Sequence, residues 1–445
     1  MSRTELVCRP STPERLLFSE VRVLDPRSGL DELRDVLVDG GVIVELAAPG
    51  SLDGEGARTI VAADELVLTS AFFDPHVHLR SPGQEHKEDL ESGTRAAAAG
   101  GYGGVIAMPN TEPVIDSAPL LRSLRDAAHR QAIVPVGFLP AITVGLQGDQ
   151  LTEMVALREE GALGFTDDGR PVTSAGMLRK ALQYQRTAGG VIALHEEDPT
   201  LSAGGSMHEG ALASSLGVTG VPTISESTMV ARDAELAAYE EGRVHFQHLS
   251  CVASVNAVAN AKANGARVSC EATPHHLLLT DAAVATLDTR MKMNPPLAGE
   301  ADRQALIEGL RSGTIDCIAT DHAPHARDEK EVPFEQAPMG TTGLETAFAA
   351  LNAGLVEPGH LRLELLLERL TDGAGLYGLP APRIAAGESA DLVLIDLGAS
   401  WIAGEHGWAS RSENCCFAGQ RMLGRPLVTV SRGAVVHDLL REGVA

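Results

Sequence analysis

The segment from residue 74 to residue 80 reads Asp74-Pro75-His76-Val77-His78-Leu79-Arg80, and it follows the apolar run Leu66-Val67-Leu68-Thr69-Ser70-Ala71-Phe72-Phe73. The run predicts a buried strand. Because side chains alternate faces along a strand, His76 and His78 point the same way, as two ligands of one metal ion must. Active sites of parallel α/β barrels are built at the C-terminal ends of their strands. The segment therefore predicts a metal-dependent hydrolase, although two structural histidines held by their neighbours would give the same local pattern.

Composition restricts the class of protein. The chain has 445 residues, of which 44% are hydrophobic, enough for one large domain and a smaller one. A formal charge of −24 argues against a nucleic-acid or anionic-membrane partner, so local cations must hold any anionic substrate. Apolar runs are too short to span a membrane, and the start Met1-Ser2-Arg3-Thr4-Glu5 lacks a secretory core, which predicts a cytoplasmic protein. The six cysteines show no CxxC spacing, so neither disulfides nor a thiolate zinc site is expected.

Short β-rich runs alternate with helix-like segments between about residues 72 and 321. We predict eight strands, at 72–78, 104–108, 133–138, 163–167, 191–195, 244–248, 267–271 and 315–321. Helix-like segments lie between them, among them 120–131, 151–161, 175–188, 225–241, 255–263 and 303–311. This alternation predicts an α/β fold, a TIM-like (β/α)8 barrel with the helices outside. An open doubly wound sheet is the alternative, but no Gly-rich phosphate fingerprint follows the first strand.

The two ends of the chain have a different pattern. Runs typical of β-strands occur at 17–24 and 35–38 near the N-terminus, and at 391–395 and 427–430 near the C-terminus, without a helical period. Neither end could bury a sheet face alone, so we predict one small β-sandwich assembled from both termini. The expected boundaries are 1–68 and 376–445 for the two parts of the sandwich, and 69–375 for the barrel inserted between them.

Metal-ligand residue types recur where the predicted strands end. The set comprises four histidines and two carboxylates: His76, His78, Asp167 or Asp168, His195, His248 and Asp321. Such a set is sufficient for two divalent cations with a carboxylate between them, and nitrogen-plus-oxygen ligands suit zinc better than magnesium or calcium. Any one of these residues alone would more often be structural, but six at the ends of five strands favour a metal site.

The chain resembles the amidohydrolase superfamily and, within it, the class I dihydroorotases. The motifs that carry the resemblance are the 74–80 segment, Pro82-Gly83, Lys87-Glu88, Met108-Pro109-Asn110-Thr111, 164–169, Thr273-Pro274-His275-His276, Asn294-Pro295-Pro296, 319–325 and Gly343-Leu344-Glu345-Thr346. The resemblance implies reversible, zinc-dependent hydrolysis of dihydroorotate to N-carbamoyl-L-aspartate, a step of pyrimidine (UMP) biosynthesis. A homodimer and an aspartate transcarbamoylase partner are further expectations at the level of the family.

The same resemblance implies a metal centre with two zinc ions per chain. Its ligands would be His76 and His78 on one ion, His195 and His248 on the other, Asp168 and a hydroxide as bridges, and Asp321 on the first ion as acid–base. Many relatives bridge their metals with a carboxylated lysine, but no lysine lies between Lys87 and Lys180. An aspartate bridge is therefore expected. The family places it at the second aspartate of the pair, which leaves Asp167 to support a ligand or a strand end.

Substrate-binding residues also follow from the resemblance. They are Arg80, Asn110 and His325 for the carboxylate, and Asn294 with backbone near Met339 and Gly340 for the pyrimidine ring. A fixed guanidinium suits a small carboxylate, and Arg80, two residues past a ligand, faces the same mouth. Lys292 is a second candidate cation, but a solvated lysine is the preferred interpretation. Of the other histidines, His275 and His276 are expected to be structural or to support the metal ligands, and His86, His129, His360, His406 and His437 are expected to lie on the surface.

Three rival functions make different demands on the sequence. A hydantoinase or dihydropyrimidinase would have the strand-four lysine and no carboxylate-binding arginine, and an allantoinase would lack Arg80. An inactive dihydroorotase-like subunit that scaffolds aspartate transcarbamoylase should have lost ligands, and all six are present.

Two departures from the family pattern are Glu196, where relatives commonly have cysteine, and His208, where asparagine is usual. Neither removes a ligand.

Overall fold

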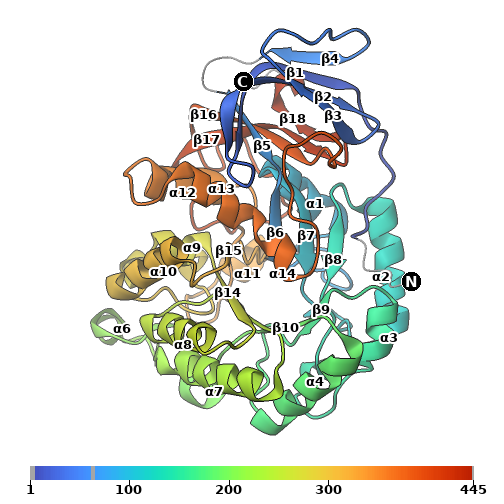
Figure 1. Ribbon diagram of the computed structural model, residues 1–445. Coiled ribbons are helices and arrows are strands. Elements are labelled where there is room, and N and C mark those ends of the chain that lie inside the picture. Colours follow the sequence, from blue (N-terminus) through green and yellow to red (C-terminus); the bar gives the residue numbers. More distant parts are fainter. Residues whose placement is uncertain (1–5, 62–65, 443–445) are drawn as a thin grey trace.

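The computed structural model describes residues 6–61 and 66–442. The start Met1–Glu5, on which the expectation of no secretory signal rests, lies outside these residues. Within the described ranges, none of the helices combines the length and apolar character that a bilayer crossing needs. The elements form an α/β fold in which parallel strands lie in the middle of the molecule and helices lie around them (Figure 1).

Each of the eight predicted central strands has a counterpart in the structure. They are β6 (Phe72–Val77), β7 (Tyr102–Ala107), β8 (Val136–Phe138), β9 (Gly164–Thr166), β10 (Val191–Leu194), β13 (Val244–Phe246), β14 (Val268–Ala272) and β15 (Cys317–Ile318). They pair in parallel in two sheets, ordered β6-β7-β8 and β9-β10-β13-β14-β15. Backbone contacts join these sheets at both sides: the Leu163 amide donates to the Phe138 carbonyl at 3.1 Å, and Val77 forms a parallel bridge with His322.

Helices cover the strands. The longer ones are α1 (Leu90–Ala99), α2 (Ala118–Gln131), α4 (Ala175–Ala188), α7 (Ile224–Glu240), α8 (Val252–Ala263), α10 (Glu300–Ser312) and α13 (Leu363–Thr371). The shorter elements are α3 (Met154–Glu159), α5 (Pro199–Ser202), β11 (Met207–His208), α6 (Ala211–Leu216), β12 (Gly220–Val221), α9 (Pro274–Leu278), α11 (Arg327–Lys330), α12 (Ala347–Leu351), α14 (Gly373–Leu376) and α15 (Leu439–Glu442). In α4, Ser174 caps the first turn, and Leu178, Ala181 and Leu182 face the core.

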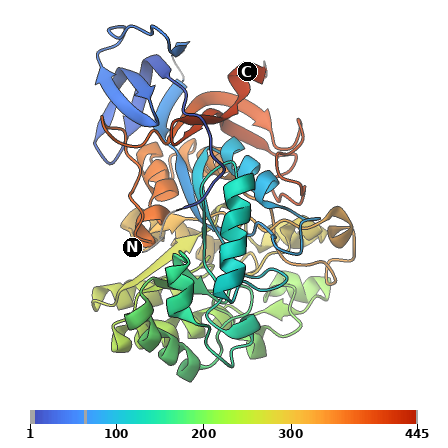
Figure 2. The same cartoon turned by 90° about the vertical axis from the view of Figure 1, so that its right-hand side faces the viewer.

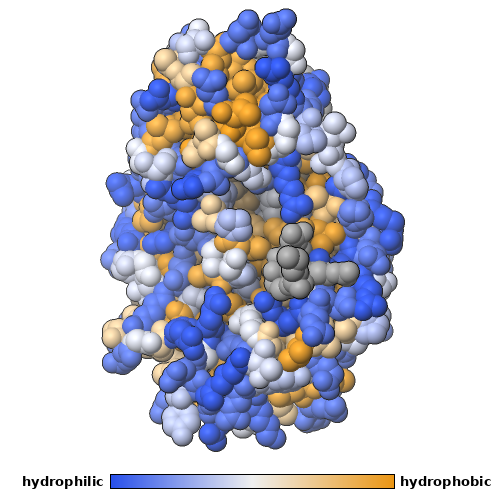
Figure 3. Space-filling model, turned by 45° about the vertical axis from the view of Figure 1, so that its right-hand side comes forward, coloured by the Kyte–Doolittle hydropathy of each residue, from blue (hydrophilic) through white to orange (hydrophobic). Residues whose placement is uncertain are grey.

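Strands from both ends of the chain form one further sheet of eight strands. They are β1 (Leu16–Asp25), β2 (Leu30–Asp39), β3 (Val42–Ala47), β4 (Arg58–Val61), β5 (Leu66–Ser70), β16 (Leu392–Ile402), β17 (Arg421–Ser431) and β18 (Ala434–Asp438). The two ends meet where β5 pairs antiparallel with β16, with Leu68 opposite Leu394. In Figure 2 the blue and red strands lie together at one end of the molecule. Apolar atoms gather on one face of this end (Figure 3), and the exposed apolar side chains of the sheet include Leu33, Val42 and Val44.

The prediction of one strand through the apolar run 66–73 is wrong. The run contains two strands that belong to different sheets, since β5 ends at Ser70 and β6 begins at Phe72. Between them the Ala71 amide donates to the Asp391 carbonyl at 3.0 Å, outside either ladder. The sequence has no Gly or Pro at this break. The C-terminal segment that packs beside Ala71 imposes the break.

Candidate metal centre

The predicted ligands lie where parallel strands end, and all of them are buried. His76 is in β6, His78 follows it, and the others come one to three residues after β9, β10, β13 and β15. His248 and Asp321 have positive φ, 33° and 47°, and so does Arg80, at 56°. L-residues rarely adopt this conformation, and in proteins it concentrates at functional sites. Here the chain turns sharply as it leaves the strand.

His76, His78, Asp168 and Asp321 direct their polar atoms to one place. Asp321 Oδ1 lies 3.0 Å from His78 Nε2 and 3.4 Å from His76 Nε2. Both of these nitrogens lie 3.5 Å from oxygens of Asp168. His76 Nε2 is buried and has no hydrogen-bond partner among the described residues. A lone imidazole nitrogen facing two carboxylates is a donor set that fits a divalent cation.

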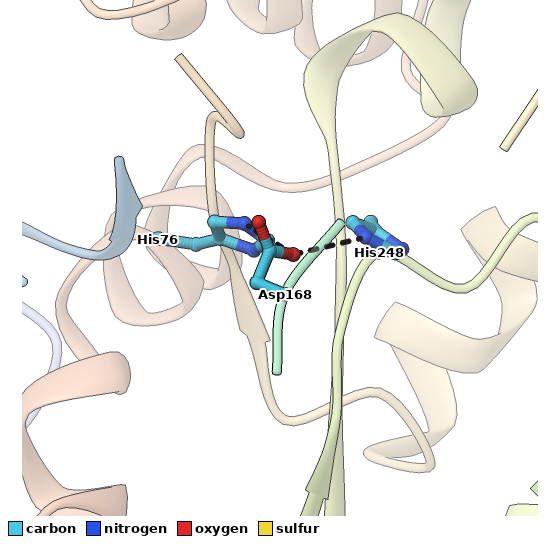
Figure 4. Close-up of side chains that lie close together, drawn as sticks. All are labelled: His76, Asp168 and His248. Carbon is cyan, nitrogen blue, oxygen red and sulfur yellow. Dashed lines mark ion pairs between the residues drawn. The ribbon is translucent and has the colours of Figure 1, made fainter. Parts of the chain in front are cut away.

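His195 and His248 form a second cluster on the other side of Asp168. Their facing nitrogens, His195 Nδ1 and His248 Nε2, lie 2.8 Å apart. Asp168 Oδ1 is 3.7 Å from the first and 3.9 Å from the second. Figure 4 shows the Asp168 carboxylate between His76 and His248. Two imidazole nitrogens facing each other beside a carboxylate fit a second cation, with Asp168 within reach of both.

Electrostatics keep the two carboxylates of this centre ionised. Burial opposes ionisation of Asp168, but the histidines around it, His76 first, hold its pKa well below the usual value. Burial likewise opposes ionisation of Asp321, and His76 and His78 lower its pKa. Both side chains are therefore charged acceptors at neutral pH.

Asp167 faces away from this cluster. Its carboxylate accepts hydrogen bonds from the Ile142 and Thr143 amides at 2.8 and 3.0 Å, and from the Thr143 hydroxyl. Burial raises the pKa of Asp167 to about 6 in spite of these bonds. Asp167 thus secures the loop after β8, whereas Asp168 lies among the histidines.

A pocket of about 220 Å³ opens beside the metal-ligand residues. It brings together all but one of the predicted site residues: His78, Arg80, Asn110, Asp168, His195, His248, Asn294, Asp321, His325, Met339 and Gly340. Only His76, which is fully buried, is not part of the wall. Gly169 and Ala323 complete the lining. The volume suits a small ring compound.

The cationic side of the pocket is formed around Arg80. Its Nε donates to the Pro324 carbonyl at 3.0 Å, which fixes the guanidinium. His325 Nε2 lies 2.8 Å from the Met339 carbonyl and must donate to it, since a carbonyl only accepts. Burial, and then the charges of Arg80 and Lys330, lower the pKa of His325 to about 2, so its imidazole is neutral. The His325 amide donates to Asn414 Oδ1 at 3.0 Å, which ties this wall to the C-terminal segment.

Asn110 and Asn294 are anchored to the predicted ligand histidines. Asn110 Oδ1 lies 2.8 Å from His78 Nδ1, and Asn110 Nδ2 donates to Asp168 at 3.2 Å. Asn294 Nδ2 donates to Glu197 at 2.7 Å, and Glu197 lies 3.2 Å from His195 Nε2. Burial opposes ionisation of Glu197, but His195 and Asn294 lower its pKa to about 2.

Sequence reasoning missed the acidic residues that contact the predicted ligands. Besides Glu197, Asp74 accepts the His76 amide at 3.1 Å, and Glu271 lies 2.6 Å from His76 Nδ1. Asp74 and Glu271 both lie in predicted strands, where a buried carboxylate needs partners. The need of a buried carboxylate for partners could have marked Asp74 and Glu271 as site residues. It could not have shown which histidine each of them contacts.

Two minor expectations are wrong. Lys292 is not solvated, because the 333–340 loop covers it, and its ammonium donates to the Glu335 carbonyl at 2.9 Å. His437 is half-buried instead of on the surface, and burial lowers its pKa to about 4. The expected exposure is confirmed for His86, His129, His360 and His406, and His275 and His276 are buried. His208 lies on the short strand β11, beside Val221, and Glu196 is buried.

Comparisons with known proteins extend over nearly the whole chain. The family model described as dihydro-orotase-like matches residues 65–254. A curated protein of Geobacter sp. (strain M21), named dihydroorotase, is 43% identical over 95% of this chain and 99% of its own. One of Anaeromyxobacter sp. (strain K), with the same name, is 44% identical over 94% of this chain and 96% of its own. Among solved structures, an L-hydantoinase (dihydropyrimidinase) from Arthrobacter aurescens has a TM-score of 0.85 at 25% identity, covering 96% of each chain. A D-hydantoinase from Thermus sp. has a TM-score of 0.81 at 24% identity, covering 95% of each.

Proposed function

The chain belongs to the dihydroorotase family, and on that premise we propose how its residues bind dihydroorotate and open the ring. It is a cyclic amide hydrolase with candidate metal-ligand clusters, as expected of a metal-dependent superfamily. The hydantoinases share its fold at 20–25% identity, well below the 41–44% of the curated dihydroorotases. One observation supports the proposal above all: three of the four predicted ligand histidines and both predicted ligand carboxylates line one pocket with the buried Arg80.

The proposal includes a finer description of the fold. Residues 69–375 would form a closed (β/α)8 barrel, supported by the backbone contacts on both sides of the two parallel sheets. Residues 1–68 and 376–445 would form a β-sandwich. One shared apolar cluster supports it, since Phe18 and Val36 from the N-terminal strands pack with Leu394 and Val428 from the C-terminal ones.

We propose two zinc ions in the metal centre. His76, His78 and Asp321 would hold one, His195 and His248 the other, and Asp168 would bridge them. Such a pair of cations acidifies water toward a pKa of about 7 and polarises a carbonyl oxygen. Nitrogen and oxygen donors in these numbers suit zinc, and the unpartnered His76 Nε2 supports the assignment of the first site.

Asp321 is the proposed acid–base. Hydrolysis forms a bond from water oxygen to the ring carbonyl carbon and breaks the bond from that carbon to the ring nitrogen. Asp321 would take the proton lost by the water and return it to the leaving nitrogen. Its ionised carboxylate at the pocket wall supports this role. In reverse, the same residue would serve the cyclisation of N-carbamoyl-L-aspartate.

Arg80 is the proposed carboxylate clamp, assisted by Asn110 and His325. Because the His325 N–H is donated to Met339, it can bind a carboxylate only by exchanging that bond. Asn294 and the backbone at Met339 and Gly340 would contact the ring. A guanidinium pairs with a carboxylate through charge-assisted bonds, which suits an acidic protein with an anionic substrate.

Substrate preference tests the proposed function. Purified chain loaded with zinc should hydrolyse dihydroorotate with a higher kcat/KM than dihydrouracil, hydantoin or allantoin, and a chelator should remove this activity. A preference for dihydrouracil or allantoin would make a neutral cyclic amide the substrate.

Family resemblance also supports a homodimer and an aspartate transcarbamoylase partner, which sedimentation with and without that partner would test.

Arg80→Met should keep both zinc ions and lower kcat/KM for dihydroorotate by roughly two orders of magnitude, since a charge-assisted pair contributes a few kcal/mol. Dihydrouracil lacks the carboxylate, so its kcat/KM should fall much less. Steady-state kinetics on both substrates give the ratio. Lys292→Met removes another buried cation, outside the pocket wall, and should leave that ratio unchanged. If instead Lys292→Met changes the ratio and Arg80→Met does not, the clamp is Lys292.

Asp168→Ala should lose at least one zinc equivalent, because this carboxylate lies between both histidine clusters. Asp167→Ala should keep both ions and lose activity through the loop at Ile142 and Thr143. Zinc per chain, measured by atomic absorption after dialysis, distinguishes them. The two variants remove the same charge at adjacent positions, so each is the control for the other. If Asp167→Ala lost zinc and Asp168→Ala kept both ions, the bridge would be Asp167.

A further inference from the structure

A buried carboxylate that the reaction does not use lies directly behind the metal centre. Glu271 is at the end of β14 and is fully buried. Its Oε1 lies 2.6 Å from His76 Nδ1, and its Oε2 lies 3.0 Å from Nε2 of a second buried histidine, His245. Glu271 therefore joins a proposed zinc ligand to a histidine that is remote from the pocket.

These contacts determine which nitrogen of His76 is free. An ionised carboxylate only accepts hydrogen bonds, so His76 must donate from Nδ1 to Glu271. An imidazole that binds a metal ion must be neutral and carries one N–H, so this hydrogen bond leaves the lone pair on Nε2. His76 Nε2 is the buried atom without a partner that faces Asp168 and Asp321 at 3.5 and 3.4 Å. Glu271 thus selects the tautomer that presents a lone pair to the metal centre.

His245 continues the same pattern outward. It must donate from Nε2 to Glu271, so its Nδ1 is an acceptor, and the Ser269 hydroxyl lies 2.9 Å from it. Each bond of this row from Ser269 to His76 then has one donor and one acceptor. The side chains of His76, Glu271 and His245 are nearly inaccessible to solvent, so no water can replace a lost partner between them.

A different role for the same residues is a third metal site. His245, Glu271 and Cys317 lie close enough to share an ion, with ligand atoms within 4.8 Å of one another. However, both oxygens of Glu271 are already engaged by imidazoles. Burial also raises the pKa of the Cys317 thiol well above its usual value, whereas a zinc ligand must be a thiolate.

We propose that Glu271 is a positioning residue for zinc, that it acts by orienting His76, and that His245 acts through Glu271. The inference rests on the proposed metal centre. Carboxylates that orient a metal-binding histidine typically contribute 10–100-fold to metal affinity. Glu271 has a second imidazole on its other oxygen, so its own orientation is fixed as well.

The test is zinc affinity, measured by competition with a chromophoric chelator. Glu271→Gln should weaken binding of one of the two ions by roughly 10–100-fold, and excess zinc should restore kcat with little change in KM for dihydroorotate. His245→Phe keeps a ring of similar volume without the donor and should give a smaller loss. In the double variant, His245→Phe should add almost nothing to Glu271→Gln, because its effect passes through the carboxylate.

Glu226→Gln is the matched control. Glu226 is another buried carboxylate near the C-terminal ends of the strands, bonded to the Ser250 amide and hydroxyl but to no imidazole. The zinc affinity of Glu226→Gln should equal that of the wild type. Thermal unfolding should show that all variants are folded. The inference is overturned by unchanged affinity in Glu271→Gln, by an equal loss in Glu226→Gln, or by additive effects in the double variant. A third zinc equivalent in the wild type that disappears in Glu271→Gln would make Glu271 a ligand instead. Wild-type protein that binds no zinc would overturn the proposed function itself.

Discussion

Asp321→Asn is expected to lower kcat for dihydroorotate by about three orders of magnitude, within the 10²–10⁴-fold range of general acid–base catalysis. The amide cannot accept the proton of the attacking water. Asparagine tolerates the left-handed backbone conformation that Asp321 adopts, with φ of 47°, so the fold should persist. Because the defect concerns proton transfer, kcat for dihydrouracil should fall by the same factor.

Asp316→Asn is the control for this substitution. Asp316 lies just before β15, at the opposite end of the strand from Asp321, and pairs with Lys262 at 2.6 Å. It should affect stability but not the relative rates on the two substrates. Single-turnover kinetics with measured zinc content separate slow chemistry from lost metal. Retention of more than a tenth of wild-type kcat in Asp321→Asn would assign proton transfer to another group.

Joint replacement of His76 and His78 by alanine is expected to abolish turnover and to remove at least one zinc equivalent. Both nitrogens face Asp168 and Asp321, and His76, His78 and Asp321 lie close enough to one another to hold one ion. Truncating buried rings also creates cavities, which destabilises the fold by a few kcal/mol. Zinc content and the thermal midpoint should therefore be measured together.

The double variant of His129 and His360 controls for the loss of two imidazoles. Both side chains are exposed, so zinc content, turnover and the thermal midpoint should all match the wild type. Undiminished zinc and activity in the His76 and His78 variant would remove the basis of the proposed metal centre.

The strands and longer helices could be predicted because their sequences have a local pattern. The strands that follow α2, α4 and α10 are apolar, β-rich and bounded by polar residues, so their positions were right to within a few residues. Helix α1 was missed, since its alanine, glycine and serine residues give no clear apolar stripe, although the capping pair Asp89 and Ser92 marks its start. The break at Ala71 had no local signal, because the partner that imposes it, Asp391, is remote in sequence.

In the candidate site, too, features with a local sequence pattern were predictable and contacts between distant segments were not. Strand alternation and strand ends were enough to predict that His76 and His78 face one carboxylate, Asp321, and that Arg80 lies at the same pocket as His78. The partners of the ligands were not predictable, because the contact between Glu271 and His76 depends on which strands become neighbours. The burial of Lys292 depends on a loop whose path has no periodic pattern. Features of the site that depend on nearby residues in the sequence were therefore predictable. Contacts that depend on distant segments were not.

The pairing of β5 with β16 has a consequence for the synthesis of the protein. A nascent chain that has not reached residue 392 leaves the edge of β5 open, next to β6, which carries His76. The segment that follows β16 also completes the pocket, because Ser410 bonds to Glu88 and Asn414 holds the His325 backbone. Residues up to at least Asn414 must therefore be synthesised before the candidate pocket is assembled. Prematurely terminated copies would be inactive and open to proteolysis at the same time.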